Sequence, residues 1–232
     1  MKLSFNQPAI LPWGGFFARL LLSDAMILLD DTYFAQGFTF VNRNRIKSPS
    51  GELWFTVPII KKGKGRQKIN ELIIYQKNKW VKKFLSTINH CYGKSIFFNS
   101  VYSKLEEIMK DNNTSFIQLV LNLLKLCCEE LGIQKSFILH SSLNINEQGT
   151  ALIISLANKL SSDEIILPYH SKEHLYMDLI SKANIKITFF KYDQLPYPQF
   201  WGDFICNLSI LDTLLCLGPY TREIILKSAI LR

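Results

Sequence analysis

The first 31 residues carry the hydrophobic pattern of a strand, a polar turn, a helix and a second strand. The apolar positions of Lys2–Phe5 give way to Gln7-Pro8, and the first strand ends there because proline cannot donate to the ladder of a sheet. Apolar residues recur at helical spacing in Phe16–Leu21, and Met26–Leu29 is a short, wholly apolar run. The pattern predicts a strand–helix–strand unit of an α/β sheet.

Polar residues follow both predicted strands at the same edge of the sheet. The turn from Gln7 to Gly15 contains Trp13 and follows the first strand, and the pair Asp30-Asp31 follows the second. In open α/β sheets ligands bind at the carboxyl ends of the strands, and glycine lets the backbone approach another group closely. Two interpretations stay open: the turn binds a ligand, or the unit only forms part of the core.

The rest of the chain predicts a β-hairpin, a helical segment and then alternating strands and helices. The hairpin turns at Ser48–Gly51. The expected strands span residues 38–46, 53–60, 69–75, 136–139, 164–167 and 186–190; the expected helices span 80–90, 102–109, 115–131, 150–160, 171–181 and, as the final helix, 208–216. We predict an α/β fold with a mainly parallel sheet flanked by helices, and with an inserted β-hairpin and helical segment.

We expect one domain over residues 1–232. Its parts are an N-terminal half with a basic hairpin (1–100), a helical segment (101–135) and a C-terminal α/β half (136–232). The length is ample for one large hydrophobic core.

Composition limits the class of protein and its compartment. The five cysteines show no CxxC spacing, which favours a reduced, cytoplasmic setting without structural zinc. His170 and His174 have the i, i+4 spacing of a metal pair but no suggested third ligand, so we predict no metal site. No apolar run is long enough to span a bilayer, and the N-terminus lacks the pattern of a signal peptide. The sequence names no cofactor and no oligomeric state.

Positive charge is concentrated in one part of the chain. Residues 41–104 contain fourteen lysines and arginines against two acids, Glu52 and Glu71. This segment therefore carries about +12, and the rest of the chain about −4, of the formal net charge of +8. Such asymmetry points to an anionic partner, such as phosphate, a nucleotide sugar, RNA or a membrane surface. A solvated face of a lysine-rich protein is the other interpretation.

Two arginines alternate with two asparagines on a predicted strand of this basic region. Asn42 and Asn44 would face one side of the strand, and Arg43 and Arg45 the other. Alternate guanidinium groups suit bidentate capture of a carboxylate or phosphate. The alternative is that both arginines bond to backbone carbonyls of a neighbouring loop.

The segment Lys61–Lys68, KKGKGRQK, is too polar and glycine-rich to fold alone. Either it is a solvated hairpin tip, which the composition favours, or it is a flap that closes over an anion.

Candidate catalytic and binding groups end two of the predicted strands. Asp30 and Asp31 are adjacent and point to opposite faces, so only one enters a given pocket, as a base or a metal ligand; the other interpretation is that they cap the next loop. Ser141 and Ser142 follow a later strand, and their hydroxyl and amide groups suit a phosphate or carboxylate. An ST-turn that caps the following segment is the alternative.

Near the C-terminus, the loop Tyr197–Trp201 gathers aromatic rings, a proline and the amide of Gln199. Such a loop acts as a lid over a site or plugs a core. Asn207 or Ser209 would cap the helix that follows, with Asp212 in its first turn, so a structural role for these three is as consistent as a catalytic one.

Several short motifs follow one another at characteristic spacing. They are Gln7-Pro8, Pro12-Trp13-x-Gly15-Phe16-Phe17, Asp30-Asp31, Asn42-Arg43-Asn44-Arg45-Ile46, Trp54-x-Thr56-x-Pro58, Thr87-Ile88 with Tyr92, Ser141-Ser142, Tyr197-Pro198-Gln199-Phe200 and Asn207-Leu208-Ser209-Ile210-Leu211-Asp212. In this order they resemble the WbqC-like family of bacterial proteins over nearly the whole chain. Members of that family are often encoded among genes for O-antigen, other surface polysaccharides or specialised metabolites.

The resemblance implies a biosynthetic enzyme of bacterial surface polysaccharide or of a related metabolite. The suggested activity is transfer of an acyl or aminoacyl group to an amino sugar. The chain departs from the family at Asn144–Thr150, where the family has a longer glycine-rich and charged stretch, and at Ile165–Pro168, where it has Tyr-x-Ser-Gly. If that glycine lines the ligand site, this member binds a different ligand or has lost activity.

We therefore predict a cleft that takes an anionic small molecule: a nucleotide sugar, a phosphate or a carboxylate. Two other functions stay open, a tRNA-binding protein that uses the basic region 41–104 and a non-catalytic scaffold of a glycan-assembly complex. The predicted catalytic residues are Asp30 and Asp31, and the predicted substrate-binding residues are Gln7, Trp13, Gly15, Asn42, Arg43, Asn44, Arg45, Ser141, Ser142 and Gln199.

Overall fold

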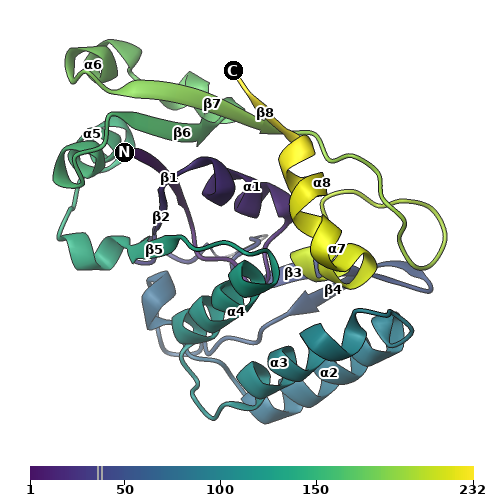
Figure 1. Cartoon of the computed structure of the whole chain (residues 1–232). Coiled ribbons are helices and arrows are strands. Elements are labelled where there is room, and N and C mark those ends of the chain that lie inside the picture. The colour runs from purple at the N-terminus through teal and green to yellow at the C-terminus, as the bar shows by residue number, and fades with distance from the viewer. Residues whose placement is uncertain (36, 38) are drawn as a thin grey trace.

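The computed structural model describes residues 1–35, 37 and 39–232, and these contain a six-stranded sheet (Figure 1). The strands lie in the order β5-β2-β1-β6-β7-β8, and neighbouring strands are parallel except β7 and β8. The predicted mainly parallel sheet is confirmed. The strands are β1 (Lys2–Asn6), β2 (Ala25–Leu28), β5 (Ser136–Leu139), β6 (Glu164–Pro168), β7 (Lys186–Tyr192) and β8 (Ala229–Leu231).

Helices cover both faces of this sheet because successive side chains of a strand point to opposite faces. Met26 and Leu28 of β2 enter a large core with α1, α4, α7 and α8, whereas Ile27 enters a smaller cluster with α5. Ile165 and Leu167 of β6 pack with α5 and α6. The helices are α1 (Gly14–Leu22), α2 (Lys77–Tyr92), α3 (Phe98–Lys110), α4 (Phe116–Glu130), α5 (Gly149–Lys159), α6 (Met177–Lys182), α7 (Ile210–Leu217) and α8 (Thr221–Lys227).

The predicted hairpin forms a separate two-stranded sheet. Strands β3 (Arg43–Ser48) and β4 (Gly51–Thr56) are antiparallel, with Ser48 opposite Gly51, so the turn is Pro49-Ser50. The hairpin contacts α7 through β3, and Phe55 of β4 meets Phe84 of α2 at a ring-centroid distance of 5.0 Å. Its buried side chains, among them Ile46 and Phe55, belong to the same large core as α1.

Two predicted elements around the hairpin are wrong. Residues 69–75 are not a strand: they form a short 3₁₀ turn, η1 (Ile69–Glu71), and isolated bridges from Ile73 and Ile74. Their buried apolar side chains pack in the large core, and their backbone forms no regular ladder with another strand. The strand predicted over 38–46 begins at Arg43, and Phe38 lies outside the described residues.

The C-terminal part also differs from the prediction. Instead of one helix over 171–181, the chain forms a 3₁₀ segment, η3 (Tyr169–His174), and then the short α6. The helix after Leu208 is not the last one. It ends at Gly218 (φ +53), and η4 (Gly218–Tyr220), α8 and β8 follow.

The strand order brings three strand ends together. Asn6 at the end of β1 lies opposite Leu28 at the end of β2, and Leu28 lies opposite Leu139 at the end of β5. Because the three strands are parallel, the loops that leave their carboxyl ends share one edge of the sheet. The next residues, Gln7, Asp30-Asp31 and the 3₁₀ turn η2 (His140–Leu143), therefore meet at this edge.

Candidate functional site

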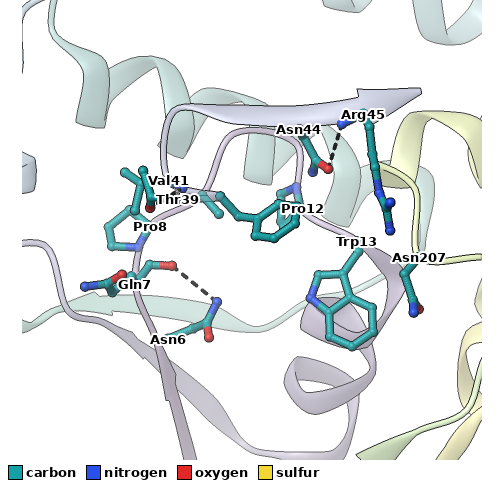
Figure 2. A pocket seen from close by; sticks show the side chains of 12 residues that line it. Asn6, Gln7, Pro8, Pro12, Trp13, Thr39, Val41, Asn44, Arg45 and Asn207 are labelled. Atoms are coloured by element: carbon teal, nitrogen blue, oxygen red, sulfur yellow. Dashed lines mark hydrogen bonds between the residues drawn. The ribbon is translucent and has the colours of Figure 1, made fainter. Parts of the chain in front are cut away.

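A cavity of about 530 Å³ opens at the carboxyl end of β1 (Figure 2). Its wall combines aromatic rings and prolines with amide side chains and one guanidinium group. It is lined by Asn6, Gln7, Pro8, Ala9, Pro12, Trp13, Thr39, Phe40, Val41, Asn44, Arg45 and Asn207. The volume is that of a typical small-molecule site.

The indole of Trp13 is held on this wall by the start of α1. A Cβ atom on Gly15 would come within 2.6 Å of the indole ring, so only glycine leaves room for it. On another side, the ring of Tyr192 meets the indole edge-on at a centroid distance of 5.0 Å. Gly15 is thus a support for Trp13 and is not part of the lining.

Asn44 of β3 holds the backbone of the turn after β1. Asn44 is buried and donates to the carbonyl of Leu11 at 2.7 Å, a residue with a left-handed backbone (φ +43). Ser209 donates to the same carbonyl at 2.8 Å. Asn42 donates to the carbonyl of Val57 at 2.8 Å and lies away from the cavity. Asn44 therefore holds the turn that forms part of the wall, whereas Asn42 ties the chain before β3 to the chain after β4.

The two arginines of β3 have different surroundings. The guanidinium group of Arg43 lies over the ring of Trp54, 4.3 Å from its centroid, and is not part of the lining. Arg45 lines the cavity, pairs with Glu52 at 2.5 Å and donates to the carbonyl of Cys206 at 3.4 Å. Arg45 thus bonds a backbone carbonyl, as one of the two interpretations predicts, and its side chain also lines the cavity.

Two polar atoms on the cavity wall are buried without a hydrogen-bond partner among the described residues. They are Nε of Arg45, a donor, and Oδ1 of Asn207, an acceptor. The Arg45 side chain extends from β3 toward Trp13 and Asn207 (Figure 2). Buried polar atoms are normally satisfied, so both atoms would gain a partner if ligand binding moved the wall and exposed them to a polar group.

The floor of the cavity is polarised by a buried arginine. Arg19 of α1 donates through Nη2 to Oδ1 of Asn6 at 2.7 Å and through Nη1 to the carbonyl of Phe5 at 3.3 Å. Burial lowers the pKa of Arg19 to about 10, so it remains charged at neutral pH. Because its oxygen is engaged, Asn6 turns its amide NH₂ to the other side, where it donates to the carbonyl of Gln7 at 3.2 Å.

Asp30, one of the two predicted catalytic residues, is fully engaged inside the protein. It is buried and accepts from the backbone N–H and hydroxyl of Ser141, at 2.9 and 2.6 Å, and from Asn70 at 3.2 Å. Ser142 donates to the carbonyl of Leu139 at 2.7 Å, as an ST-turn would. These contacts fasten the turn after β5 to the end of β2.

Asp31 has a different partner. Its Oδ1 lies 2.5 Å from Nδ1 of His140, whose other nitrogen, Nε2, is buried without a hydrogen-bond partner in the described structure. The pair adjoins the cavity through Thr32, which accepts from the cavity residue Gln7 at 3.0 Å. A carboxylate that holds Nδ1 leaves Nε2 as the basic atom of the imidazole.

Gln199 lies in a buried network away from the cavity. The carboxylate of Asp212 accepts from Tyr92 at 2.7 Å, from Tyr197 at 2.7 Å and from Gln199 at 2.8 Å. The buried amine of Lys47 donates to Gln199 at 3.1 Å and to the carbonyl of Asp203. The aromatic loop Tyr197–Trp201 thus packs into the core beside β3 and does not cover the cavity.

Some of the predicted site residues line the cavity, and the others do not. Gln7, Trp13, Asn44 and Arg45 line it, whereas Asp30, Asp31, Gly15, Asn42, Arg43, Ser141, Ser142 and Gln199 do not. Sequence reasoning missed Asn6, Asn207 and His140 as site residues. The position of Asn6 directly before Gln7-Pro8, at a strand end, was the available signal; Asn207 and His140 depend on contacts between distant segments.

Neither a metal centre nor a membrane helix is found in the part of the chain that the structure describes. No group of three or more His, Cys, Asp or Glu side chains there could hold a metal ion. No helix there has the length and apolarity needed to cross a bilayer.

Comparison with known proteins identifies the family. The model of the WbqC-like protein family matches residues 7–224. The chain is similar to the uncharacterized protein Rv1507c of Mycobacterium tuberculosis, with 28% identity over 219 residues, which are 94% of each chain. No solved structure matches it. Because the family match includes almost all of the sequence, the chain belongs to the WbqC-like protein family.

Proposed function

We propose that this protein is a biosynthetic transferase of bacterial surface-glycan or related metabolite assembly, and that its cavity binds an amino sugar to which an acyl or aminoacyl group is transferred. The observation that carries the proposal is the pair of unsatisfied atoms beside Trp13, Nε of Arg45 and Oδ1 of Asn207. One is a donor and the other an acceptor. A sugar hydroxyl both accepts and donates hydrogen bonds, so the hydroxyls of a sugar ring suit both atoms.

The other lining groups support a sugar over a simple anion. Arg45 is paired with Glu52 at 2.5 Å, so the wall offers little net positive charge to a lone carboxylate. Trp13 offers a flat apolar surface, and Asn6 adds an oriented amide donor. Polar groups that fix the orientation within a mainly apolar wall are typical of small-molecule sites.

Acyl transfer to an amine needs a group that takes up a proton. The amine nitrogen attacks the acyl carbonyl carbon, the new C–N bond forms, and the bond from that carbon to the donor's leaving group breaks. The proton lost by the amine goes to Nε2 of His140, and Asp31 holds the opposite nitrogen. Since Nε2 is enclosed in the absence of ligand, the reaction requires that substrate binding expose it.

The binding step is tested by calorimetric titration of the full chain with glucosamine, galactosamine and their N-acetyl forms. Asn207 has a left-handed backbone (φ +56), so Asn207→Gly removes the acceptor without adding strain. The matched control is Asn184→Gly, at an exposed position with φ +55 far from the cavity. We expect at least tenfold weaker binding for Asn207→Gly and an unchanged affinity for the control. Equal affinities in all three proteins, or no saturable binding by the wild type, would overturn the proposal.

A further inference from the structure

The basic segment Lys61–Lys68 is fastened to the same edge of the sheet as the cavity. Phe34 N–H donates to the carbonyl of Gln67 at 2.9 Å, Ile69 N–H donates to the carbonyl of Thr32 at 3.0 Å, and Tyr33 and Lys68 form a β-bridge. The C-terminal end of the segment is therefore held against the chain that leaves β2.

The anchor of this segment is continuous with the cavity wall. Thr32, which accepts from Ile69 N–H, also accepts at 3.0 Å from the side chain of Gln7, and Gln7 lines the cavity. Farther along the chain, Thr39 and Phe40 line the cavity as well. The C-terminal end of the basic segment is thus linked to the proposed sugar site through one residue, Thr32, which bonds both Ile69 and Gln7.

The cations of the segment have no acidic partner among the described residues. Lys61, Lys62, Lys64, Arg66 and Lys68 take part in none of the ion pairs found there, and the segment itself contains no acid. Five like charges within eight residues create a strong local positive potential and repel one another. A bound anion relieves this repulsion.

Aromatic contacts orient two of these cations at the anchor. The guanidinium group of Arg66 lies over the ring of Tyr33, 4.3 Å from its centroid, and the amine of Lys61 lies 5.3 Å from the ring of Phe34. Between them, Gly63 and Gly65 have left-handed backbones (φ +76 and +60) and open space around them, so the tip is exposed. The segment is thus an exposed tip, as the composition favours, yet its base is fixed at the ligand edge.

We infer that the segment Lys61–Lys68 binds the diphosphate group of a diphosphate-linked sugar whose sugar ring occupies the adjacent cavity. This inference rests on the proposed sugar site and names its substrate class. Arginine suits bidentate contact with a phosphate, and lysines act on it as point charges. The described lining of the cavity offers no unpaired cation for such a group, since Arg45 is paired with Glu52, and the neighbouring segment supplies five.

The test uses the full chain and measures binding of uridine diphosphate, guanosine diphosphate, geranyl diphosphate and inorganic pyrophosphate by calorimetry. The test variant is Lys62→Gln/Lys64→Gln/Arg66→Gln. The matched control is Lys79→Gln/Lys82→Gln/Lys83→Gln, which removes three exposed charges from α2. We expect the test variant to bind diphosphates at least tenfold more weakly and the control to stay within twofold of the wild type. Preference for the nucleoside or for the prenyl compound identifies the source of the diphosphate.

Three outcomes would overturn the inference. They are no diphosphate binding by the wild type, an equal loss in both triple variants, and binding of single-stranded RNA that depends on the α2 lysines and displaces the diphosphate. Failure of the sugar site is recognised separately, because amino-sugar binding to the test variant should equal that of the wild type. A protein that binds diphosphate through the segment but no sugar would retain the anion site and contradict only the proposed function.

Discussion

The guanidinium group of Arg19 donates to Oδ1 of Asn6 at 2.7 Å, and this bond decides which end of the Asn6 amide is turned to the cavity. The arginine has only neutral acceptors there, the amide oxygen and the carbonyl of Phe5. A cation in such surroundings is costly: a pKa lowered from 12.5 to about 10 corresponds to about 3 kcal/mol of desolvation at neutral pH. This cost lowers the stability of the folded protein, but the contact orients the amide donor of Asn6 at the cavity.

The first prediction concerns the contact between Arg19 and Asn6, where one substitution should raise stability and weaken sugar binding. Asn6→Asp gives Arg19 a carboxylate partner, so we expect the free energy of unfolding at pH 7 to rise by about 1–2 kcal/mol. The same change removes the amide donor, so amino-sugar affinity should fall. Denaturant unfolding at pH 7 and pH 3 checks the origin of the gain, because a protonated aspartic acid would no longer pair with Arg19. A variant that is both less stable and fully able to bind would contradict the assignment.

The second prediction concerns the support of the indole. In Gly15→Ala the added Cβ would lie 2.6 Å from the ring of Trp13, so the ring must move. We expect a loss of about 1–3 kcal/mol in unfolding free energy, as for other overpacked sites, and at least tenfold weaker sugar binding. The double-mutant cycle with Trp13→Ala is the control, since Gly15→Ala should cost little once the indole is absent. Additive costs would show that the contact does not hold Trp13.

These contacts also show where sequence patterns suffice and where they do not. The short run Ser136–Leu139, with three apolar residues in succession, predicted β5 to the residue, although β5 is an edge strand and only partly buried. The segment Ile69–Tyr75 is also rich in apolar residues, but it forms a 3₁₀ turn and isolated bridges. Local pattern does not reveal which other segment pairs with such a run.

The site was predicted in part for a related reason. Gln7 and Trp13 follow a strand end directly, and strand ends can be located from the pattern. Gln199 was assigned to the site from its polar, aromatic loop, yet its partners are Asp212 and Lys47 inside the core. The pairing of Asp31 with His140 spans 109 positions of the chain and becomes visible only in three dimensions.

The third prediction distinguishes the two adjacent carboxylates. Asp30 accepts three hydrogen bonds from Ser141 and Asn70, so Asp30→Asn should lower the free energy of unfolding by about 1–3 kcal/mol. Among the described residues, Asp31 holds the imidazole of His140 alone, so Asp31→Asn should change stability by less than about 1 kcal/mol. Urea unfolding of both variants tests this. Equal destabilisation would show that Asp31 also has a structural role.

The fourth prediction concerns the reaction itself. If Nε2 of His140 takes the proton, His140→Gln and Asp31→Asn should each reduce acyl transfer by a factor on the order of 10² or more, while amino-sugar affinity stays near that of the wild type. The measurement is product formation from a panel of acyl donors, followed by mass spectrometry. Ser142→Ala, which alters a hydroxyl of the same turn, is the control. Full activity in both test variants would remove the pair from the mechanism.

The last prediction uses the buried carboxylate of Asp212. Burial raises its pKa, and the bonds from Tyr92, Tyr197 and Gln199 oppose that effect only in part. With a folded-state pKa above the unfolded value of about 4, the folded protein binds more protons in this range. The contribution of Asp212 to stability is therefore fully present below about pH 4 and is lost as the pH rises through the folded-state pKa. The loss is about 1.4 kcal/mol for every tenfold difference between the folded and unfolded proton affinities. The Asp212→Asn variant has no carboxyl group at this position, so its stability lacks this pH-dependent contribution.

Unfolding curves at a series of pH values from 3 to 8 measure this difference. The stability of the wild type relative to Asp212→Asn should decrease with rising pH and then level off. Asp193→Asn, at an exposed position paired with Lys191 at 3.7 Å, is the control. A wild-type advantage that grew with pH would mean that the three donors outweigh burial and that the carboxylate is stabilised in its charged form. In that case the nearby amine of Lys47 would also favour the charged carboxylate.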